Sequence, residues 1–455
     1  MHITLKILTS FALTSMVTYS SAATASDPVA DATTALNNEI MASSTAYENL
    51  RELTSMGHRL SGTANAERAV QWAKTKLEAY GFDNVTLQPV EVPHWERGHH
   101  ESGYVVSNNQ TTNLKLAALG NSSGTSGITA GVIEVKSLSE VTRLGEAVRG
   151  KIIFYNRPMD PTLASTFEAY GRAVDQRSSG PRVASGLGAV AVLVRSMTTL
   201  DNNDEPHTGM TNFGSSPRIP SAALSTRSAN DLSAILRDDP TAQLHLELSA
   251  NVLAPVISYN VYAEYLGASL PHDYVVVGGH LDSWDLGQGA HDDGAGVVQA
   301  IEVVRALKAL NLRPKRTVRV VLFMSEENGA AGAREYAKQA GLKNEKHVAA
   351  LESDEGGFAP IGFSGMFGGM RSRLDLWKTY LEPVGPMTLR DGEGGTDVDP
   401  LASLGAICYG LNPDSTHYFD YHHAANDRFE AVNKTDLHRG AAAMAIMTYL
   451  FANEY

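Results

Sequence analysis

Cysteine is almost absent from this sequence: Cys408 is the only one among 455 residues. An internal disulfide is therefore impossible, and zinc sites built from several cysteines are excluded. Basic residues are also outnumbered, with 37 Lys and Arg against 50 Asp and Glu, which gives a net charge of −13 with histidine neutral. Because such a charge repels phosphate groups, nucleic acids and anionic lipid surfaces are poor partners. Any metal site must use histidines and carboxylates.

Long apolar runs are missing beyond the N-terminus, so no later segment approaches the roughly 20 residues of a membrane span. The N-terminal run follows Lys6, extends over about residues 7–19 and precedes the small-residue pattern Ala-Thr-Ala at 23–25. This order is typical of a secretory signal peptide. We predict that residues 1–25 are a signal peptide and that the mature protein is exported, to the periplasm or the medium, without a membrane span.

The composition is that of a folded protein, with 43% hydrophobic and 19% charged residues. Asparagine, threonine, glycine and serine dominate residues 107–127, which indicates a surface loop near a domain boundary. We predict an α/β domain formed by residues 26–117 and 251–455, with a smaller β/α domain inserted at 118–250. Its sheet is expected to be mixed but largely parallel and flanked by helices, because the long apolar strands after residue 255 need cover on both faces.

Side chains that can bind a metal follow three predicted strands and begin one predicted helix. They are His280 and Asp282 after the strand at 274–279, Glu326 and Glu327 after the strand at 317–324, Asp354 after a short strand that begins near 347, and Asp292 and Asp293 at the start of an amphipathic helix. Open parallel sheets bind ligands at the carboxyl ends of their strands, so we expect these groups to converge. Adjacent carboxylates repel one another and need a cation. The sequence therefore predicts a metal site made of histidines and carboxylates.

Several of these stretches resemble the two-zinc exopeptidases of peptidase family M28, and within it the plasma glutamate carboxypeptidase branch. The matching strings are RLSGT (59–63), GGHLDSWDLGQGAHDDGAG (278–296), SEENGAAGAREY (325–336), ESDEGG (352–357), GTDV (395–398) and YHHAAND (421–427). The inserted segment is similar to a protease-associated domain. The resemblance covers essentially the whole mature chain, and it implies the zinc exopeptidase fold and two Zn²⁺ per chain.

The resemblance also implies a role for each residue of the site. His280 and Asp354 would bind one zinc ion, Glu327 and His423 the other, and Asp292 would bridge the two. Glu326 would be the general base that takes a proton from a metal-bridging water and passes it to the leaving amine. Asp282 would accept the other imidazole N–H of His280 and fix its tautomer.

The C-terminal ligand and the substrate contacts leave alternatives open. His422 and His423 are adjacent, and the family spacing His-x-x-x-Asp selects His423, with Asp427 as its orienting partner. Tyr418 or Tyr421 could donate a hydrogen bond to the developing oxyanion, or either could simply pack.

Asp397, which follows Thr396 in the GTDV string, could hold a substrate ammonium group or cap its own loop.

The predicted function is hydrolysis of dipeptides or short peptides at a free terminus by a dinuclear zinc site. One rival is a non-catalytic receptor on the same scaffold, and another is a single-zinc glutaminyl cyclase. Both rivals are disfavoured by the presence of all five ligand positions. The expected partner is a peptide or dipeptide substrate, and a homodimer is possible.

Overall fold

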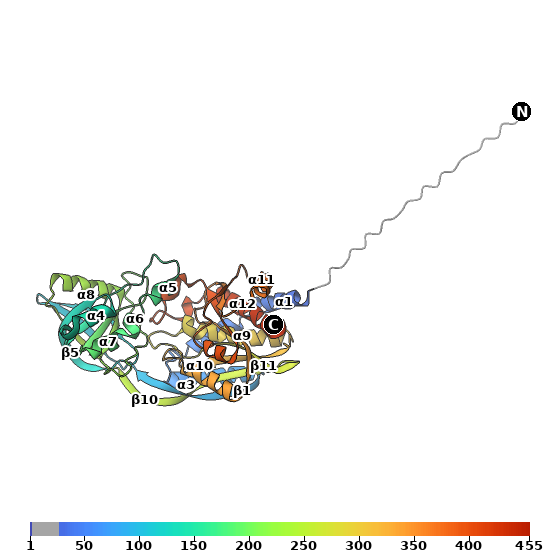
Figure 1. The fold of residues 1–455 in the computed structure, drawn as a ribbon, viewed down its shortest axis with the longest axis horizontal. Coiled ribbons are helices and arrows are strands. Elements are labelled where there is room, and N and C mark those ends of the chain that lie inside the picture. Colours follow the sequence, from blue (N-terminus) through green and yellow to red (C-terminus); the bar gives the residue numbers. More distant parts are fainter. Residues whose placement is uncertain (2–26) are drawn as a thin grey trace.

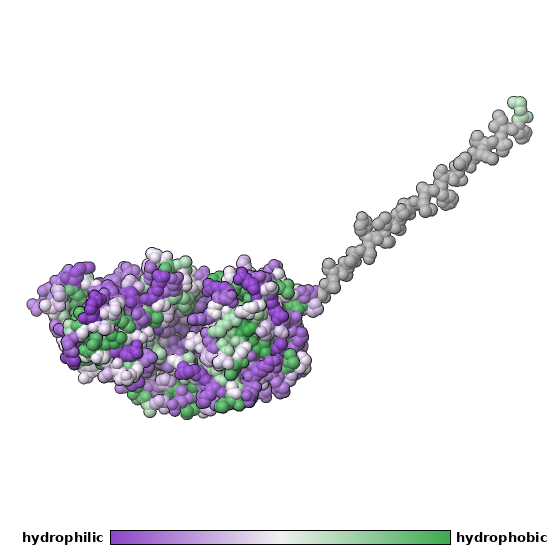
Figure 2. Space-filling model, in the orientation of Figure 1, coloured by the Kyte–Doolittle hydropathy of each residue, from purple (hydrophilic) through white to green (hydrophobic). Residues whose placement is uncertain are grey.

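The computed structural model describes Met1 and residues 27–455, so the predicted signal peptide lies, apart from Met1, outside the described residues. The described chain forms two eight-stranded sheets. Figure 1 shows them in two lobes that lie side by side, with the long strands β1 and β10 running beneath both. Among the described residues, no helix combines the length and the apolar character that a membrane crossing requires. On the face shown in Figure 2, hydrophobic residues form separate patches among hydrophilic ones.

The sheet of the larger lobe is mixed, as predicted. Its strands, in spatial order, are β1 (Asp83–Glu96), β10 (Asn251–Tyr265), β12 (Arg316–Phe323), β11 (Leu270–His280), β13 (Lys346–Glu352), β16 (Ile407–Pro413), β14 (Pro360–Gly365) and β15 (Thr388–Asp391). The four central strands β12, β11, β13 and β16 run parallel. Antiparallel pairs join β1 to β10, β10 to β12 and β14 to β16, whereas β15 runs parallel to β14. The carboxyl ends of the parallel strands therefore lie along one edge of this sheet.

Helices cover both faces of this sheet, which explains its continuous apolar strands. They are α1 (Pro28–Ala42), α2 (Thr45–Thr54), α3 (Ala64–Ala79), α9 (Ala295–Ala309), α10 (Ala331–Leu342), α11 (Arg371–Tyr380) and α12 (Lys434–Asn453). Val275 and Val277 of β11 join the core that contains α9 and α12, whereas Val276 between them joins the core that contains Tyr336 of α10. Successive side chains of a strand point to opposite faces, so each face needs its own cover.

The smaller lobe contains the second sheet. Its strands, in spatial order, are β3 (Gln110–Asn113), β2 (Glu101–Ser107), β9 (Gln243–Leu248), β5 (Thr125–Val135), β6 (Ile152–Tyr155), β7 (Ala191–Arg195), β8 (Ser221–Leu224) and β4 (Leu116–Ala118). Strands β5 to β8 run parallel. The sheet includes β2, β3 and the start of β4, which precede residue 118, because β2 pairs with β9 and β4 pairs with β8.

The helices of the smaller lobe are short, apart from α8 (Thr226–Asp238). The others are α4 (Leu138–Leu144), α5 (Thr166–Gly171), α6 (Asp175–Ser178) and α7 (Gly180–Gly186). Tyr418 and Phe419 of the larger lobe belong to the hydrophobic core of the smaller one. Arg97 and Asp285 also join the lobes through two hydrogen bonds of 2.8 and 2.6 Å. The lobes therefore share packed and charged contacts, and the predicted metal ligands lie at this junction.

Candidate metal centre

The five residues predicted as ligands lie together. His280 Nε2 is 3.0 Å from Asp354 Oδ1 and 3.3 Å from Asp292 Oδ1. His423 Nε2 is 3.0 Å from Glu327 Oε2 and 3.2 Å from Asp292 Oδ2. Asp292 thus lies between the two histidines, with one carboxylate oxygen directed at each.

Most of these side chains lie at or just after the ends of strands, and one lies just before the start of a helix. His280 is the last residue of β11, Glu327 follows β12 by four residues and Asp354 follows β13 by two. Asp292 lies in the short helical turn η2 (Ala290–Gly294) directly before α9, where its own backbone is not helical. His423 follows η4 (Ser415–Asp420), the turn after β16. The five predicted ligands therefore gather at the carboxyl edge of the parallel strands.

The chemistry of this donor set fits two divalent cations. Asp292 and Glu327 are 5% and 7% exposed, and Asp292 Oδ2 and Glu327 Oε1 are buried without a hydrogen-bond donor among the described residues. Buried carboxylates that lack donors and lie beside other carboxylates are unfavourable unless a cation compensates them. Two groups of side chains whose donor atoms lie close enough to hold a metal ion share Asp292: one contains His280 and Asp354, the other His422 and His423. Histidine nitrogens and carboxylate oxygens are ligands that zinc accepts.

His423, rather than His422, faces the carboxylates. Burial alone would lower the pKa of His423, but Glu327 and Asp292 raise it to about 9. The ring of His422 stacks on that of His423 with centroids 3.5 Å apart, and burial holds its pKa well below the usual range. His422 is therefore the neutral packing partner of the ligand that the sequence selects.

Glu326 lies at a cavity of about 510 Å³ between the lobes. The same cavity is lined by the predicted ligands Asp292, Glu327, Asp354 and His423, and by Phe167, Tyr170, Arg177 and Met210 of the smaller lobe. Burial raises the pKa of Glu326 well above its usual range, and the charges of Asp354 and Glu327 add to this effect. A carboxyl group with a raised pKa can hold a proton near neutral pH, which is the property of a general base that later acts as an acid.

Two predicted orienting contacts differ from the structure. The Nδ1 atom of His280 contacts the backbone carbonyl of Asp282 at 3.1 Å, whereas the Asp282 carboxylate lies 3.7 Å away. That carboxylate instead accepts hydrogen bonds from the amides of Ser325 and Glu326. Asp282 thus holds the loop of Glu326, and its main chain, rather than its side chain, contacts Nδ1 of His280.

Asp427 is likewise not the partner of His423. Its carboxylate accepts hydrogen bonds from the amides of His291 and Asp292, at 2.8 and 3.2 Å. The Nδ1 atom of His423 instead lies 3.2 Å from the carbonyl oxygen of Thr208, in the smaller lobe. The predicted orienting partner was therefore wrong, because the group that contacts Nδ1 of His423 comes from a segment 215 residues away.

The two tyrosines predicted as alternative substrate contacts lie in different surroundings. Tyr418 lines the cavity of Glu326, and its hydroxyl donates to the carbonyl of Asp354 at 3.4 Å. Tyr421 instead packs against His291, with ring centroids 5.1 Å apart. Of these two tyrosines, only Tyr418 therefore lines the cavity of Glu326.

Asp397 is buried at 1% exposure beside Glu352, and burial and that neighbour raise its pKa well above the usual range. The loop amides of Gly394 and Gly395 donate to Asp399. Thr396 lines the cavity of Glu326, whereas the carboxylate of Asp397 accepts no hydrogen bond among the described residues. The structure thus assigns the capping role in this loop to Asp399 and not to Asp397.

Residues that carried no prediction also build the site. Arg59 is fully buried and donates to the carbonyls of Leu281, Gln288 and Gly289. Asp293 accepts from the amides of His280 and Gly296, and so joins the end of β11 to the start of α9. Arg59 lies in the RLSGT string, and that match is the signal by which it could have been found.

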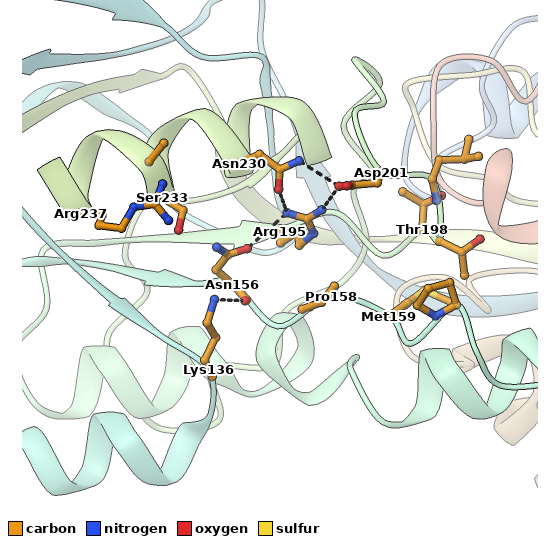
Figure 3. Close-up of a pocket in the computed structure, with 14 residues that line it drawn as sticks. Lys136, Asn156, Pro158, Met159, Arg195, Thr198, Asp201, Asn230, Ser233 and Arg237 are labelled. Carbon is orange, nitrogen blue, oxygen red and sulfur yellow. Dashed lines mark hydrogen bonds and ion pairs between the residues drawn. The ribbon is translucent and has the colours of Figure 1, made fainter.

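A second polar pocket lies wholly within the smaller lobe (Figure 3). It measures about 550 Å³ and opens at the carboxyl ends of β6 and β7. Arg195 at its centre is bonded to Asn156, Asn230 and Asp201, as the dashed lines show. None of the predicted site residues lines this pocket. The predicted metal ligands therefore belong to a different cavity.

Comparison with known proteins agrees with this site. The model of peptidase family M28 matches residues 260–448. Carboxypeptidase Q of Mus musculus is 35% identical over 415 residues, which are 90% of this chain and 85% of the mouse protein. The crystal structure of a peptidase M28 precursor from Shewanella amazonensis SB2B has a TM-score of 0.89 and 33% identity, and the match covers 93% of this chain and 97% of that one.

A zinc aminopeptidase from Bacillus subtilis shares the fold, with a TM-score of 0.64 and 21% identity over 90% of this chain and 95% of that one. The resemblance seen in the sequence motifs is thus confirmed over nearly the whole described chain. The chain therefore belongs to peptidase family M28 and is a metallo-exopeptidase.

Proposed function

We propose that this protein is a dinuclear zinc exopeptidase that hydrolyses dipeptides or short peptides with Glu326 as the general base. The observation that carries the proposal is the position of Asp292, whose Oδ1 faces His280 and whose Oδ2 faces His423. A carboxylate placed in this way could hold two cations at once, one through each oxygen. The zinc aminopeptidase that shares the fold supports zinc as the metal.

The chain's own residues would hold the two ions in a symmetric manner. His280 with Asp354, and His423 with Glu327, form the two outer pairs around Asp292. Each ion would then have three protein ligands, which would leave room for water and substrate, as in catalytic zinc sites. When bound, the two ions supply Lewis acidity that polarises the scissile carbonyl and favours ionisation of water.

Glu326 and Tyr418 line the cavity in which the peptide bond would lie. Glu326 takes a proton from the attacking water, the water oxygen bonds to the carbonyl carbon, and Glu326 returns the proton to the amine as the C–N bond breaks. The hydroxyl of Tyr418 can donate a hydrogen bond to the carbonyl oxygen as negative charge develops there. Peptide and water are thereby converted into an acid and an amine.

The size of the cavity favours a short substrate. Its volume of about 510 Å³ lies within the range of small-molecule sites, roughly 300–1,000 Å³. A neighbouring cavity of about 780 Å³ shares Phe167, Tyr170, Asp354 and Thr396 with it. Side chains from both lobes enclose the space, so a dipeptide or short peptide enters more readily than a folded protein.

The test compares Glu326→Gln with the matched control Glu78→Gln, whose side chain on α3 is 51% exposed. We expect Glu326→Gln to bind two zinc ions per chain but to lose at least about a hundredfold in kcat for a dipeptide. A chelator should abolish activity in the wild type, and zinc should restore it.

Near-normal turnover by Glu326→Gln would refute the role of Glu326. A stoichiometry of one zinc per chain would favour the glutaminyl cyclase rival, and two bound zinc ions without any peptidase activity would favour the receptor.

A further inference from the structure

We infer that the smaller lobe is a working part of the metal site, because its residues His207 and Thr208 position the ligand His423. This inference rests on the proposed metal site and assigns these two residues a positioning role. Neither residue touches a reacting atom. They act through the segment that contains His422 and His423.

Three hydrogen bonds join the two segments side by side. The Nδ1 atom of His207 lies 2.7 Å from the carbonyl oxygen of His422. The amide of Thr208 donates to the carbonyl of His423 at 3.1 Å, and Nδ1 of His423 lies 3.2 Å from the carbonyl of Thr208. His207 and Thr208 are fully buried, so water does not compete for these bonds.

The donors in these contacts follow from chemistry. A carbonyl oxygen only accepts, so Nδ1 of His207 must carry its proton, and burial lowers the pKa of this histidine to about 3, which keeps it neutral. By the same rule Nδ1 of His423 donates its proton to Thr208. Its Nε2 atom is then free of hydrogen in the neutral ring and can bind a metal beside Glu327 and Asp292.

Arg177 of the smaller lobe donates to the same acceptor, the carbonyl oxygen of Thr208. Its Nη1 donates to the carbonyl of Thr208 at 3.1 Å and lies 3.4 Å from Nδ1 of His423. A guanidinium group only donates hydrogen bonds. In the alternative arrangement, Nδ1 of His423 would therefore accept a hydrogen bond from Arg177, and the proton of the neutral ring would be on Nε2. The shorter contact to Thr208 favours the first arrangement. An Nε2 without hydrogen is also what a cation held by Glu327 and Asp292 would require.

The backbone conformation of His423 explains why these hydrogen bonds from the smaller lobe are needed. Its φ of +61° lies in the left-handed region, which is unfavourable for a residue other than glycine. Such a conformation persists only where the surroundings hold it. The bond from the amide of Thr208 and the bond from His207 to the preceding carbonyl hold this segment from the other lobe.

The two histidine ligands therefore depend on different parts of the chain. His280 contacts the carbonyl of Asp282, two residues away in the same loop. His423 contacts a carbonyl of the smaller lobe, which is itself tied down: Oγ1 of Thr208 donates to the carbonyl of Ala118 at 2.8 Å. Disturbing the segment of His207 and Thr208 should loosen the site of Glu327 and His423 and leave the site of His280 and Asp354 intact.

The experiment measures zinc affinity of both sites by chelator competition in the full-length protein. Three variants are compared: His207→Ala, which removes the donor; His207→Asn, whose amide can donate from nearly the same place; and the control His245→Ala on β9 of the smaller lobe. We expect His207→Ala to lower the affinity for one zinc ion by about 10- to 100-fold, as loss of an orienting partner does. The affinity for the other ion should not change. His207→Asn should restore most of this loss, and the control should match the wild type.

Equal affinities in His207→Ala and the wild type, or an equal loss at both sites, would overturn the inference. If His207→Ala does not fold, imidazole ¹⁵N NMR of the zinc-loaded wild type decides, with His423→Ala used only to assign the signal. A proton on Nδ1 of His423 supports the inference, and its absence overturns it. Failure of the wild type to bind two zinc ions would instead refute the proposed function.

Discussion

The carboxylate of Asp427 holds the backbone of Asp292, because its two oxygens accept from the amides of His291 and Asp292. Asp427 is 3% exposed, and burial raises its pKa to about 7 despite these bonds. The segment that follows the C-terminal ligand thereby fixes the orientation of the ligand shared by both proposed ions. This contact leads to the first prediction.

Asp427→Asn should weaken zinc binding at both sites. The amide can accept one of the two hydrogen bonds, but its NH₂ group then faces the other backbone N–H, and a buried donor is left unpaired. We expect a loss of about 10- to 100-fold in affinity for both ions, measured by chelator competition. The control is Asp375→Asn on α11, where the side chain is 56% exposed. Unchanged affinity in Asp427→Asn would show that Asp292 is held without it.

Replacement of Arg59 should destabilise the whole larger lobe. Its guanidinium donates to three backbone carbonyls at 2.6–2.9 Å in the loop between β11 and α9. Arg59→Met leaves these acceptors without donors, so we expect the free energy of unfolding to fall by about 2–5 kcal/mol. Equilibrium unfolding in guanidinium chloride measures this change in the free energy of unfolding. Arg68→Met, at an exposed position on α3, should change it by less than about 0.5 kcal/mol, and equal effects of the two variants would contradict the prediction.

Zinc binding at the site of His423 should release a proton at neutral pH. In the metal-free chain the pKa of His423 is about 9, above its ordinary 6.5. The protonated ring therefore stabilises the metal-free fold fully below about pH 6.5, and this stabilisation is lost as the pH rises through 9. Because zinc needs the neutral ring, its apparent affinity should increase up to about pH 9.

Titration calorimetry at pH 7 in two buffers of different protonation heat measures the protons released. Binding heats that do not depend on the buffer would contradict the prediction. His423→Ala serves as the control, and it should release at least about one proton fewer.

Cys408 should be unreactive in the folded protein. It lies in β16 with no exposed surface, its thiol donates to the carbonyl of Val398 at 3.0 Å, and burial raises its pKa to about 12. Since the thiolate is the reactive form, a disulfide reagent at pH 8 should label no thiol in the native state and one per chain in denaturant. Rapid labelling under native conditions would show that β16 opens locally.

The ligand set was predictable because it depends on local order along the chain. An apolar strand followed at once by His280, or by the pair Glu326 and Glu327, places a polar group at the carboxyl edge of a parallel sheet wherever that strand lies. The family motifs then selected His423 from two adjacent histidines, and the 3.0 Å contact with Glu327 agrees with that choice.

The partners of these ligands were less predictable. Spacing favoured Asp282 for His280 and Asp427 for His423, but backbone carbonyls occupy both positions. Every residue carries a carbonyl, so the pattern of side chains in a sequence contains no trace of which carbonyl is used. The extent of the second sheet was hard to predict for a similar reason, because β2 joins this sheet through backbone pairing with β9, which lies well over 100 residues later in the chain.

The order of residue types alone indicated the α/β class and the chemistry of the donor atoms, because these follow from hydrophobic runs and the polar groups at their ends, and the family motifs in the sequence then named the five predicted ligands. Folding in three dimensions settled which groups orient them: Thr208 reaches His423, and Asp427 reaches Asp292, across separations of 215 and 135 residues. Such contacts depend on how two lobes pack, and packing sums many weak interactions that no short stretch of sequence contains.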